Sequence, residues 1–215
     1  MRIAVLGTGM VGRTLGAKLV ELGHDVRLGS RSADNAKAGE WVKSIGRAAS
    51  QGTFADAASF GEIVFNCTAG GASLDALNLA GAPHLQGKTL VDVANPLDFS
   101  HGMPPTLSIC NTESLGERIQ TAFPAANVVK TLNTVNANVM VNPSLVPGDH
   151  DVFISGNEAV AKAQVIAILK DFGWRHIVDL GDITTARGPE MWLPMWLRLW
   201  GAFKTPNINI HVTHA

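Results

Sequence analysis

Apolar and polar positions follow two alternating patterns along the chain. Short runs rich in β-branched residues, such as residues 2–6, are followed by longer segments in which apolar residues recur every three or four positions, as at Val11, Leu15 and Leu19. Strands that alternate with helices in this way are typical of βαβ units, which build a parallel sheet. The pattern predicts strands over residues 2–6, 26–28, 52–54, 62–67, 89–94, 127–132, 151–155 and 176–180, and helices over residues 11–22, 34–47, 73–80, 114–123, 158–172 and 189–203.

Two regions depart from this alternation. Residues 98–111 contain Pro, Gly and Met without a regular period, and a loop of this length suggests a functional role. In the tail, Trp192, Trp196 and Trp200 recur every four positions, so a helix places them along one face. Such a stripe suits core packing or a subunit interface, and a wall for a flat aromatic substrate is the alternative.

Composition narrows the choice of partners. The chain has 215 residues, of which 46% are hydrophobic, and its 17 basic and 18 acidic residues nearly cancel. Because no run of Lys and Arg occurs, the sequence gives no reason to expect nucleic acid or an anionic membrane as a partner. Small molecules and a second copy of the chain are the expected partners.

Neither a membrane span, a signal peptide nor a metal site is predicted. The apolar run over residues 191–203 contains Pro194 and Arg198 and is shorter than the about 20 apolar residues that span a bilayer. Glycines interrupt the apolar start of the chain too early for a signal peptide, which predicts a cytoplasmic protein. Cys67 and Cys110 lie far apart and outside any metal-ligand spacing.

A glycine-rich segment joins the first predicted strand to the first predicted helix. Its sequence is Gly7-Thr8-Gly9-Met10-Val11-Gly12, which fits the pattern G-x-G-x-x-G in the right context. In such loops the first glycine permits a tight turn, the second lets backbone N–H groups approach a pyrophosphate, and the third lets helix and strand pack closely. The segment therefore predicts a dinucleotide site in a Rossmann-type, doubly wound, mostly parallel sheet.

The end of the second strand indicates which dinucleotide is bound. NAD-binding chains of this type carry an acid there for the ribose 2′-hydroxyl, whereas an Arg accommodates the 2′-phosphate of NADP. This chain has Gly29, Ser30 and Arg31 at that place, and no acid before Asp34. A hydroxyl and a guanidinium complement a phosphate, which predicts NADP(H) as cofactor. The alternative is that Arg31 is only a solvated residue after a strand.

Three further strand ends should line the cofactor, since ligands of doubly wound sheets bind at the carboxyl ends of the strands. The residues there are small or neutral and include no strong acid or base, so no catalytic side chain is predicted. We interpret Cys67 and Lys130 as structural and His101 as an exposed loop residue. The predicted cofactor-binding residues at these ends are Thr68, Ala69, Asn95, Pro96, Asn133, Val135 and Ala137.

The glycine loop, the GSR stretch and the segment VVKTLNTVNA together resemble the NADP-dependent oxidoreductases of the deazaflavin coenzyme F420. That family's fold in turn resembles the NADPH-binding cytosolic domain of membrane metalloreductases. The resemblance covers roughly residues 1–180 and implies that Thr8, Met10 and Val11 join the glycines at the pyrophosphate. It implies that Ser30 and Arg31 hold the 2′-phosphate and that Asn133, Val135 and Ala137 lie near the nicotinamide.

The resemblance also implies an activity, which is direct hydride transfer between the nicotinamide and a deazaflavin or flavin-like ring. The expected organisation is an NADP-binding domain over residues 1–180 and a short C-terminal helical tail over residues 181–215 that serves substrate or dimer contacts. The expected assembly is a homodimer. A reductase of another small imine or ketone, and a non-catalytic NADP(H) sensor, are the alternatives.

Overall fold

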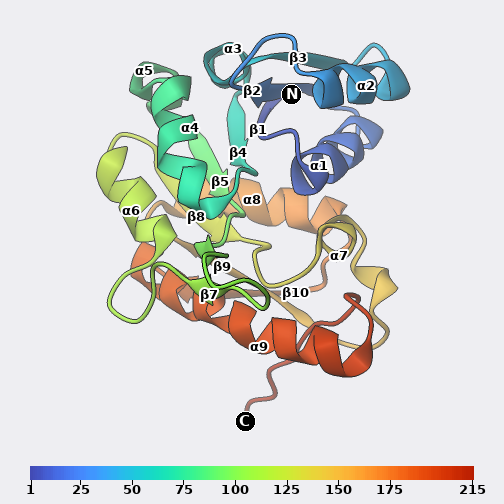
Figure 1. Cartoon of the computed structure of the whole chain (residues 1–215), viewed down its shortest axis with the longest axis vertical. Coiled ribbons are helices and arrows are strands. Elements are labelled where there is room, and N and C mark those ends of the chain that lie inside the picture. The colour runs from blue at the N-terminus through green and yellow to red at the C-terminus, as the bar shows by residue number, and fades with distance from the viewer.

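The computed structural model describes residues 1–215, and its centre is a single eight-stranded sheet. The strand order is β10-β9-β8-β5-β4-β1-β2-β3, and all neighbouring strands are parallel except β8 and β9 (Figure 1). The chain starts in the middle of the sheet, extends it to one side, and then returns to β4 to extend the other. The strands are β1 Arg2–Leu6, β2 Asp25–Ser30, β3 Ala49–Thr53, β4 Ile63–Asn66, β5 Thr89–Asp92, β8 Asn127–Thr131, β9 Asp151–Gly156 and β10 His176–Gly181.

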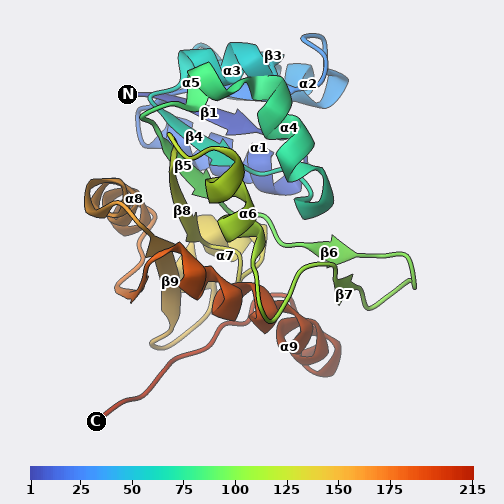
Figure 2. The ribbon, with the colours of Figure 1, turned by 90° about the vertical axis from the view of Figure 1, so that its left-hand side faces the viewer.

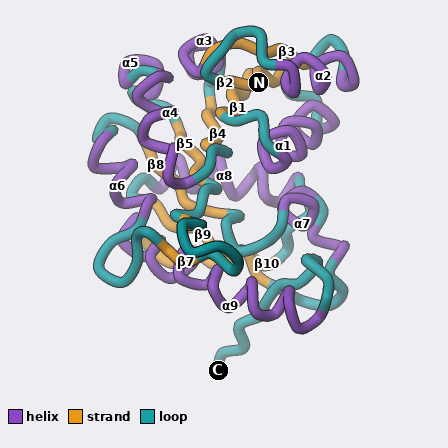
Figure 3. Tube along the Cα trace, viewed as in Figure 1, coloured by secondary structure: helices purple, strands orange, loops and turns teal.

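Helices cover both faces of this sheet, so the predicted doubly wound, mostly parallel fold is confirmed (Figure 3). One core cluster contains Leu15, Trp41, Val139 and Val165, from α1, α2, α7 and α8. A second cluster, on the other face, is built mainly from α3, α4 and α6. The helices are α1 Met10–Glu21, α2 Ala36–Ile45, α3 Phe54–Phe60, α4 Ser73–Ala80, α5 Ala82–Leu85, α6 Leu115–Ala122, α7 Ala137–Val141, α8 Ala159–Asp171 and α9 Arg187–Phe203, with short 3-10 turns η1 Gly70–Ala72, η2 Pro143–Leu145 and η3 Ile183–Ala186.

Two predictions of secondary structure were wrong in detail. The third strand is Ala49–Thr53 rather than residues 52–54, and Phe54 already begins helix α3. The cause is a capping box, in which the Thr53 hydroxyl accepts from the Asp56 backbone N–H while the Asp56 carboxylate accepts from that of Thr53. Residues 98–111, predicted as an irregular loop, form with Leu97 a small antiparallel hairpin of β6 Leu97–Asp98 and β7 Thr106–Leu107.

The C-terminal segment lies across the lower part of the molecule. Helix α9 lies close to the β6–β7 hairpin, and the chain then continues as an extended strand-like tail (Figure 2). Asp151, at the start of β9, ties this tail down: its backbone N–H donates to the Ile210 carbonyl at 2.9 Å, and its carboxylate accepts from the Val212 N–H at 2.6 Å. None of the helices is both long enough and apolar enough to cross a membrane.

Candidate dinucleotide site at the carboxyl edge of the sheet

The glycine loop between β1 and α1 depends on its glycines for different reasons. Gly7 has a φ of +118°, and a Cβ there would lie 2.6 Å from the Cys67 carbonyl oxygen. A Cβ at Gly12 would overlap the Gly7 carbonyl oxygen, so the third glycine allows α1 to pack against β1. A Cβ at Gly9 would meet nothing within 4 Å, and its φ is an ordinary −72°. The packing of the chain therefore does not require a glycine at position 9. A ligand that approaches the backbone there would require one, because a side chain would stand in its way.

The first helix is held close to its neighbours in the same way. A Cβ at Gly16 would lie 2.9 Å from the Trp41 ring, and the Trp41 indole N–H donates to the Arg13 carbonyl at 3.0 Å. Gly16 is therefore a packing residue, because only glycine lets Trp41 come this close to α1. The N-terminus of α1, with Gly9 and Met10 exposed, consequently points to solvent from a rigid base.

At the end of β2, Ser30 and Arg31 have different environments. Ser30 is buried, and its hydroxyl donates to the Ser32 carbonyl at 2.5 Å and accepts from the Ser32 N–H at 3.2 Å. Arg31 is exposed and has no hydrogen-bond or ion-pair partner within the chain. Ser30 thus shapes the turn that presents a free guanidinium at Arg31. A few residues further on, Asn35 caps α2 by accepting from the Ala38 N–H.

The strand-end loops form one continuous edge with the glycine loop. The Gly7 N–H donates to the Gly29 carbonyl at 2.9 Å, which joins the glycine loop to the end of β2. On its other side Gly7 lies against Cys67 and Thr68, at the end of β4. A Cβ at Gly70 would overlap the Asn95 carbonyl oxygen, so the loops after β4 and β5 are in contact.

The ends of β5 and β8 are joined by a reciprocal pair of amides. The Asn95 side chain donates to the Asn133 carbonyl at 2.8 Å, and the Asn133 side chain donates to the Asn95 side-chain oxygen at 2.9 Å. Thr134 is buried beside them, and its hydroxyl has no partner. An unpaired buried hydroxyl costs free energy that a ligand group can recover.

The predicted residues that follow Thr134 lead into helix α7. Val135 is buried, and Ala137 is the first residue of α7, which Asn136 caps by accepting from the Asn138 and Val139 N–H groups. The other two predicted positions flank the loops already described, Ala69 exposed and Pro96 buried. The structure therefore brings the predicted strand-end positions to the same edge as Arg31 and Gly9.

Sequence reasoning missed a buried charge cluster directly behind this edge. Lys130 on β8, interpreted only as a structural strand residue, has a fully buried side chain, and its ammonium lies 2.7 Å from Asp92 of β5 and 2.8 Å from Glu190 of α9. It also donates to the Ala94 carbonyl, next to Asn95. The two carboxylates raise the pKa of Lys130 although burial opposes them. We call Asp92, Lys130 and Glu190 the buried triad.

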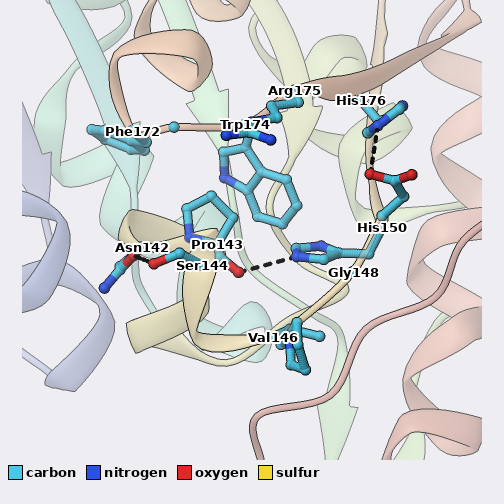
Figure 4. A pocket seen from close by; sticks show the side chains of 13 residues that line it. Asn142, Pro143, Ser144, Val146, Gly148, His150, Phe172, Trp174, Arg175 and His176 are labelled. Atoms are coloured by element: carbon cyan, nitrogen blue, oxygen red, sulfur yellow. Dashed lines mark hydrogen bonds and ion pairs between the residues drawn. The ribbon is translucent and has the colours of Figure 1, made fainter.

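The other side chains that could take part in a reaction either lie away from the carboxyl edge of the sheet or are unreactive. Cys67 is buried at the end of β4, and desolvation raises the pKa of its thiol, which confirms its interpretation as a packed residue. His101 is exposed, as expected. A cavity of about 450 Å³ near the start of β9 and β10 contains none of the predicted site residues. In it His150 bonds the Pro143 carbonyl at 3.0 Å and packs edge-on against Trp174 (Figure 4).

The tryptophan stripe is only partly buried. Trp196 is 7% exposed and packs against Trp200, which is 40% exposed, with ring centroids 5.4 Å apart. Trp200 also lines a hollow of about 410 Å³ with Met103 and Pro104 of the β6–β7 hairpin. Core packing and an open apolar surface are thus both present on α9.

The fold and the glycine loop define an α/β protein of the Rossmann type, and comparisons with known proteins identify the family. The pattern of the family described as NADP oxidoreductase, coenzyme F420-dependent, matches residues 2–96. A solved structure from Arthrobacter sp. FB24, with the provisional name F420-dependent NADP reductase, is 53% identical, with a TM-score of 0.94 and 99% of each chain covered. The chain therefore belongs to this family, and it is an NADP-dependent oxidoreductase.

More distant relatives agree with this assignment. The F420-dependent NADP reductase of Methanocaldococcus jannaschii is 27% identical, and the match covers 100% of this chain and 99% of that protein. Metalloreductase STEAP3 of Rattus norvegicus is 30% identical, but this chain spans only 38% of its length. A reductive aminase from Aspergillus terreus shares the fold, with a TM-score of 0.67 at 20% identity over 62% of that chain.

Proposed function

We propose that this protein transfers a hydride directly between NADP(H) and a deazaflavin such as F420, or a flavin-like acceptor. The observation that carries the proposal is the pairing of an unpartnered Arg31 with an uncovered Gly9 at one edge of the sheet. Membership of the family supports the same activity, as do the names of the relatives from Arthrobacter and Methanocaldococcus.

The cofactor would lie along the carboxyl edge of the sheet. Backbone N–H groups of the glycine loop, including those of Thr8, Met10 and Val11, face the position of the pyrophosphate at the N-terminus of α1. Gly9 leaves room for the phosphates to reach the backbone, since a Cβ there would occupy otherwise empty space. The fit of this loop to a dinucleotide is therefore good.

Arg31 would select NADP(H) over NAD(H). Its guanidinium has no partner in the chain and can form a bidentate contact with the 2′-phosphate. Ser30 was expected to donate to the same phosphate, but its hydroxyl proton is used by the Ser32 carbonyl. A contact between Ser30 and the phosphate stays a prediction, and it requires that hydroxyl to turn away from Ser32.

The nicotinamide would lie against the loops after β5 and β8. The buried hydroxyl of Thr134 and the amides of Asn95 and Asn133 offer neutral hydrogen-bond groups to a carboxamide. When bound, NADPH supplies the hydride. The chain's residues orient the ring and exclude water, and no general acid or base is needed for a transfer between two rings held in contact.

A flat acceptor would enter from the side of α9 and the hairpin. The hollow lined by Met103, Pro104 and Trp200 offers apolar and aromatic surface there. The homodimer predicted from the sequence would use the same helix, on which Met195 and Phe203 are exposed. The dimer, the cytoplasmic location and the division at residue 180 stay predictions.

Arg31→Glu tests the cofactor assignment. We expect a loss of NADPH affinity of at least about 30-fold, because a charge-assisted bidentate pair is replaced by repulsion, together with a gain for NADH relative to NADPH. Arg47→Glu is the matched control, since Arg47 is exposed and unpaired at the end of α2 and undergoes the same charge change. Equal effects of the two variants, or an unchanged preference, would refute the role of Arg31.

The acceptor is tested by adding F420, a flavin, or a cyclic imine to the protein with NADPH and following loss of nicotinamide absorbance. Turnover with F420 or the flavin at least about 10-fold above that with the imine is expected, because one well-placed stacking interaction with a flat ring system can supply that factor. Faster turnover with the imine would favour the alternative reductase. Tight NADPH binding with no turnover on any acceptor would favour the sensor.

A further inference from the structure

The buried triad carries an unequal number of charges. One ammonium, that of Lys130, faces two carboxylates, those of Asp92 and Glu190, and all three side chains are at most 1% exposed. Because water is excluded, the surplus negative charge is screened far less than a charge at the surface.

Each hydrogen-bonding neighbour of the two carboxylates is a donor. One Asp92 oxygen accepts from the Asn66 amide at 2.8 Å and the Ala94 N–H at 3.2 Å, and the other accepts from Lys130. The Glu190 oxygens accept from the Leu115 and Gly116 N–H groups at 2.7 and 3.0 Å, in addition to Lys130. Since every neighbour is a donor, a protonated carboxyl would lose bonds and gain none.

Other charges near this edge do not cancel the surplus. Arg187 and Glu117 pair with each other at 2.5 Å and are neutral as a pair. The N–H groups at the start of α6 contribute a partial positive charge, equivalent to about half a unit. Arg31, the free cation of the site, lies at the end of β2, which is separated from β8 by the three strands β5, β4 and β1.

The triad lies behind the loops at which the nicotinamide is proposed to bind. Asp92 ends β5, Lys130 is next to last in β8, and the two are paired in register across the strands. Asn95 and Asn133 each follow three residues later along the same strands. The bond from Lys130 to the Ala94 carbonyl joins the triad directly to the Asn95 loop.

We propose that the buried triad acts on the redox state of the bound cofactor: its surplus negative charge favours the oxidised nicotinamide, which is a cation, over the reduced one, which is neutral. This inference rests on the proposed function. With NADPH bound at these loops, Asp92 and Glu190 would stabilise the positive charge of the oxidised nicotinamide once its hydride has passed to the acceptor. The protein is thereby biased toward donating hydride to its acceptor.

The test measures the dissociation constants of NADP⁺ and NADPH separately, by calorimetry, and takes their ratio. Asp92→Asn and Glu190→Gln each remove one negative charge while keeping the side-chain shape. Each variant should weaken the binding of NADP⁺ relative to the binding of NADPH by between about 3-fold and 20-fold. This is the range expected for the loss of one charge that acts through a medium of effective dielectric constant about 20. Lys130→Met should shift the ratio in the opposite direction.

A purely structural role would give a different result, because a distorted site weakens both forms of the cofactor together. The matched control is Lys162→Met, which breaks the ion pair with Asp179 at 2.8 Å on α8 and β10, and it should leave the ratio unchanged. If Lys130→Met fails to fold, the two carboxylate variants decide.

Ratios within about twofold of wild type for both carboxylate variants, or a shift toward NADP⁺, would overturn the proposal, since neither fits removal of a nearby negative charge. The proposed function fails separately. It fails if the wild-type protein binds neither form, or if Arg31→Glu leaves binding intact, and neither result depends on the triad.

Discussion

Two glycines of the same loop allow folding and cofactor binding to be separated. Gly9 and Gly12 are both part of the glycine-rich pattern, but only Gly12 is in contact with the rest of the chain at the position of a Cβ. The substitutions Gly9→Ala and Gly12→Ala each add one methyl group. We expect the first to affect binding alone and the second to affect stability.

The cost of Gly12→Ala follows from the packing of α1 on β1. The new Cβ would overlap the Gly7 carbonyl oxygen and lie 3.4 Å from a Val5 methyl group, so the helix must move away from the strand. Overpacking of this kind costs about 1–3 kcal/mol. At about 2–4 °C per kcal/mol for a domain of this size, the melting temperature should fall by about 2–12 °C.

Gly9→Ala should leave the fold intact. The methyl group would meet no protein atom within 4 Å, and the backbone at Gly9 is already in a conformation that alanine adopts. Replacing an N-cap glycine by alanine costs about 0.5–1 kcal/mol, so the melting temperature should fall by no more than about 4 °C. The same methyl group would stand between the backbone and the pyrophosphate, and we expect NADPH affinity to fall at least about 10-fold.

Thermal melts and NADPH titrations of the two variants decide the matter. Each melt is run without cofactor, because bound ligand would itself raise the melting temperature. An unchanged melting temperature for Gly12→Ala would show that the close approach of α1 to β1 is not a constraint. Full NADPH affinity in Gly9→Ala would remove the main support for a dinucleotide at this loop.

Two other groups give simpler predictions. With Ellman's reagent, the native protein should show one fast-reacting thiol, that of the exposed Cys110, because burial raises the pKa of the Cys67 thiol and leaves it to react only after unfolding. The variant Cys110→Ser should abolish the fast reaction. Two fast-reacting thiols in the native protein would contradict this assignment. The hydrogen bond from Arg187 holds the pKa of Glu117 below its usual value, so the folded-state pKa lies below the unfolded one. The stability that ionised Glu117 contributes should be complete above about pH 4.3 and be lost as the pH falls further. The melting temperatures of Glu117→Gln and the wild type should therefore converge in acid. A difference between the two melting temperatures that stays constant over the acid range would argue against this role of Glu117.

The parts of the candidate site that the sequence could predict are those that depend on short-range patterns. The glycine loop and the GSR stretch at Ser30 and Arg31 are read from neighbouring residues, and the strand ends follow from the alternation of strands and helices. Helix α3 was missed, although the sequence contains a signal for it: Thr53 and Asp56 have the spacing of a capping box. The antiparallel direction of β9 has no local signature, since a strand's sequence does not state its direction.

The buried triad could not be read from spacing, because its members are far apart in the chain. Lys130 and Asp92 are separated by 38 positions, and Glu190 lies in the tail. A weaker signal did exist: two apolar strands, TLVD and VVKT, each carry a single charge, and the two charges are opposite. Charges within apolar strands that become neighbours in a sheet are expected to pair, because an unpaired buried charge is very costly.

The same triad explains how a short tail can belong to the site. Glu190 in α9 is the second counter-ion of Lys130, and it accepts hydrogen bonds from the start of α6. Further along, the Asn136 side chain, which caps α7, donates to the Pro206 carbonyl at 2.5 Å. A chain cut at residue 180 would lose both contacts and leave the Leu115 and Gly116 N–H groups without their carboxylate. Residues 181–215 are thus bonded to β8, to the start of α6 and to the cap of α7.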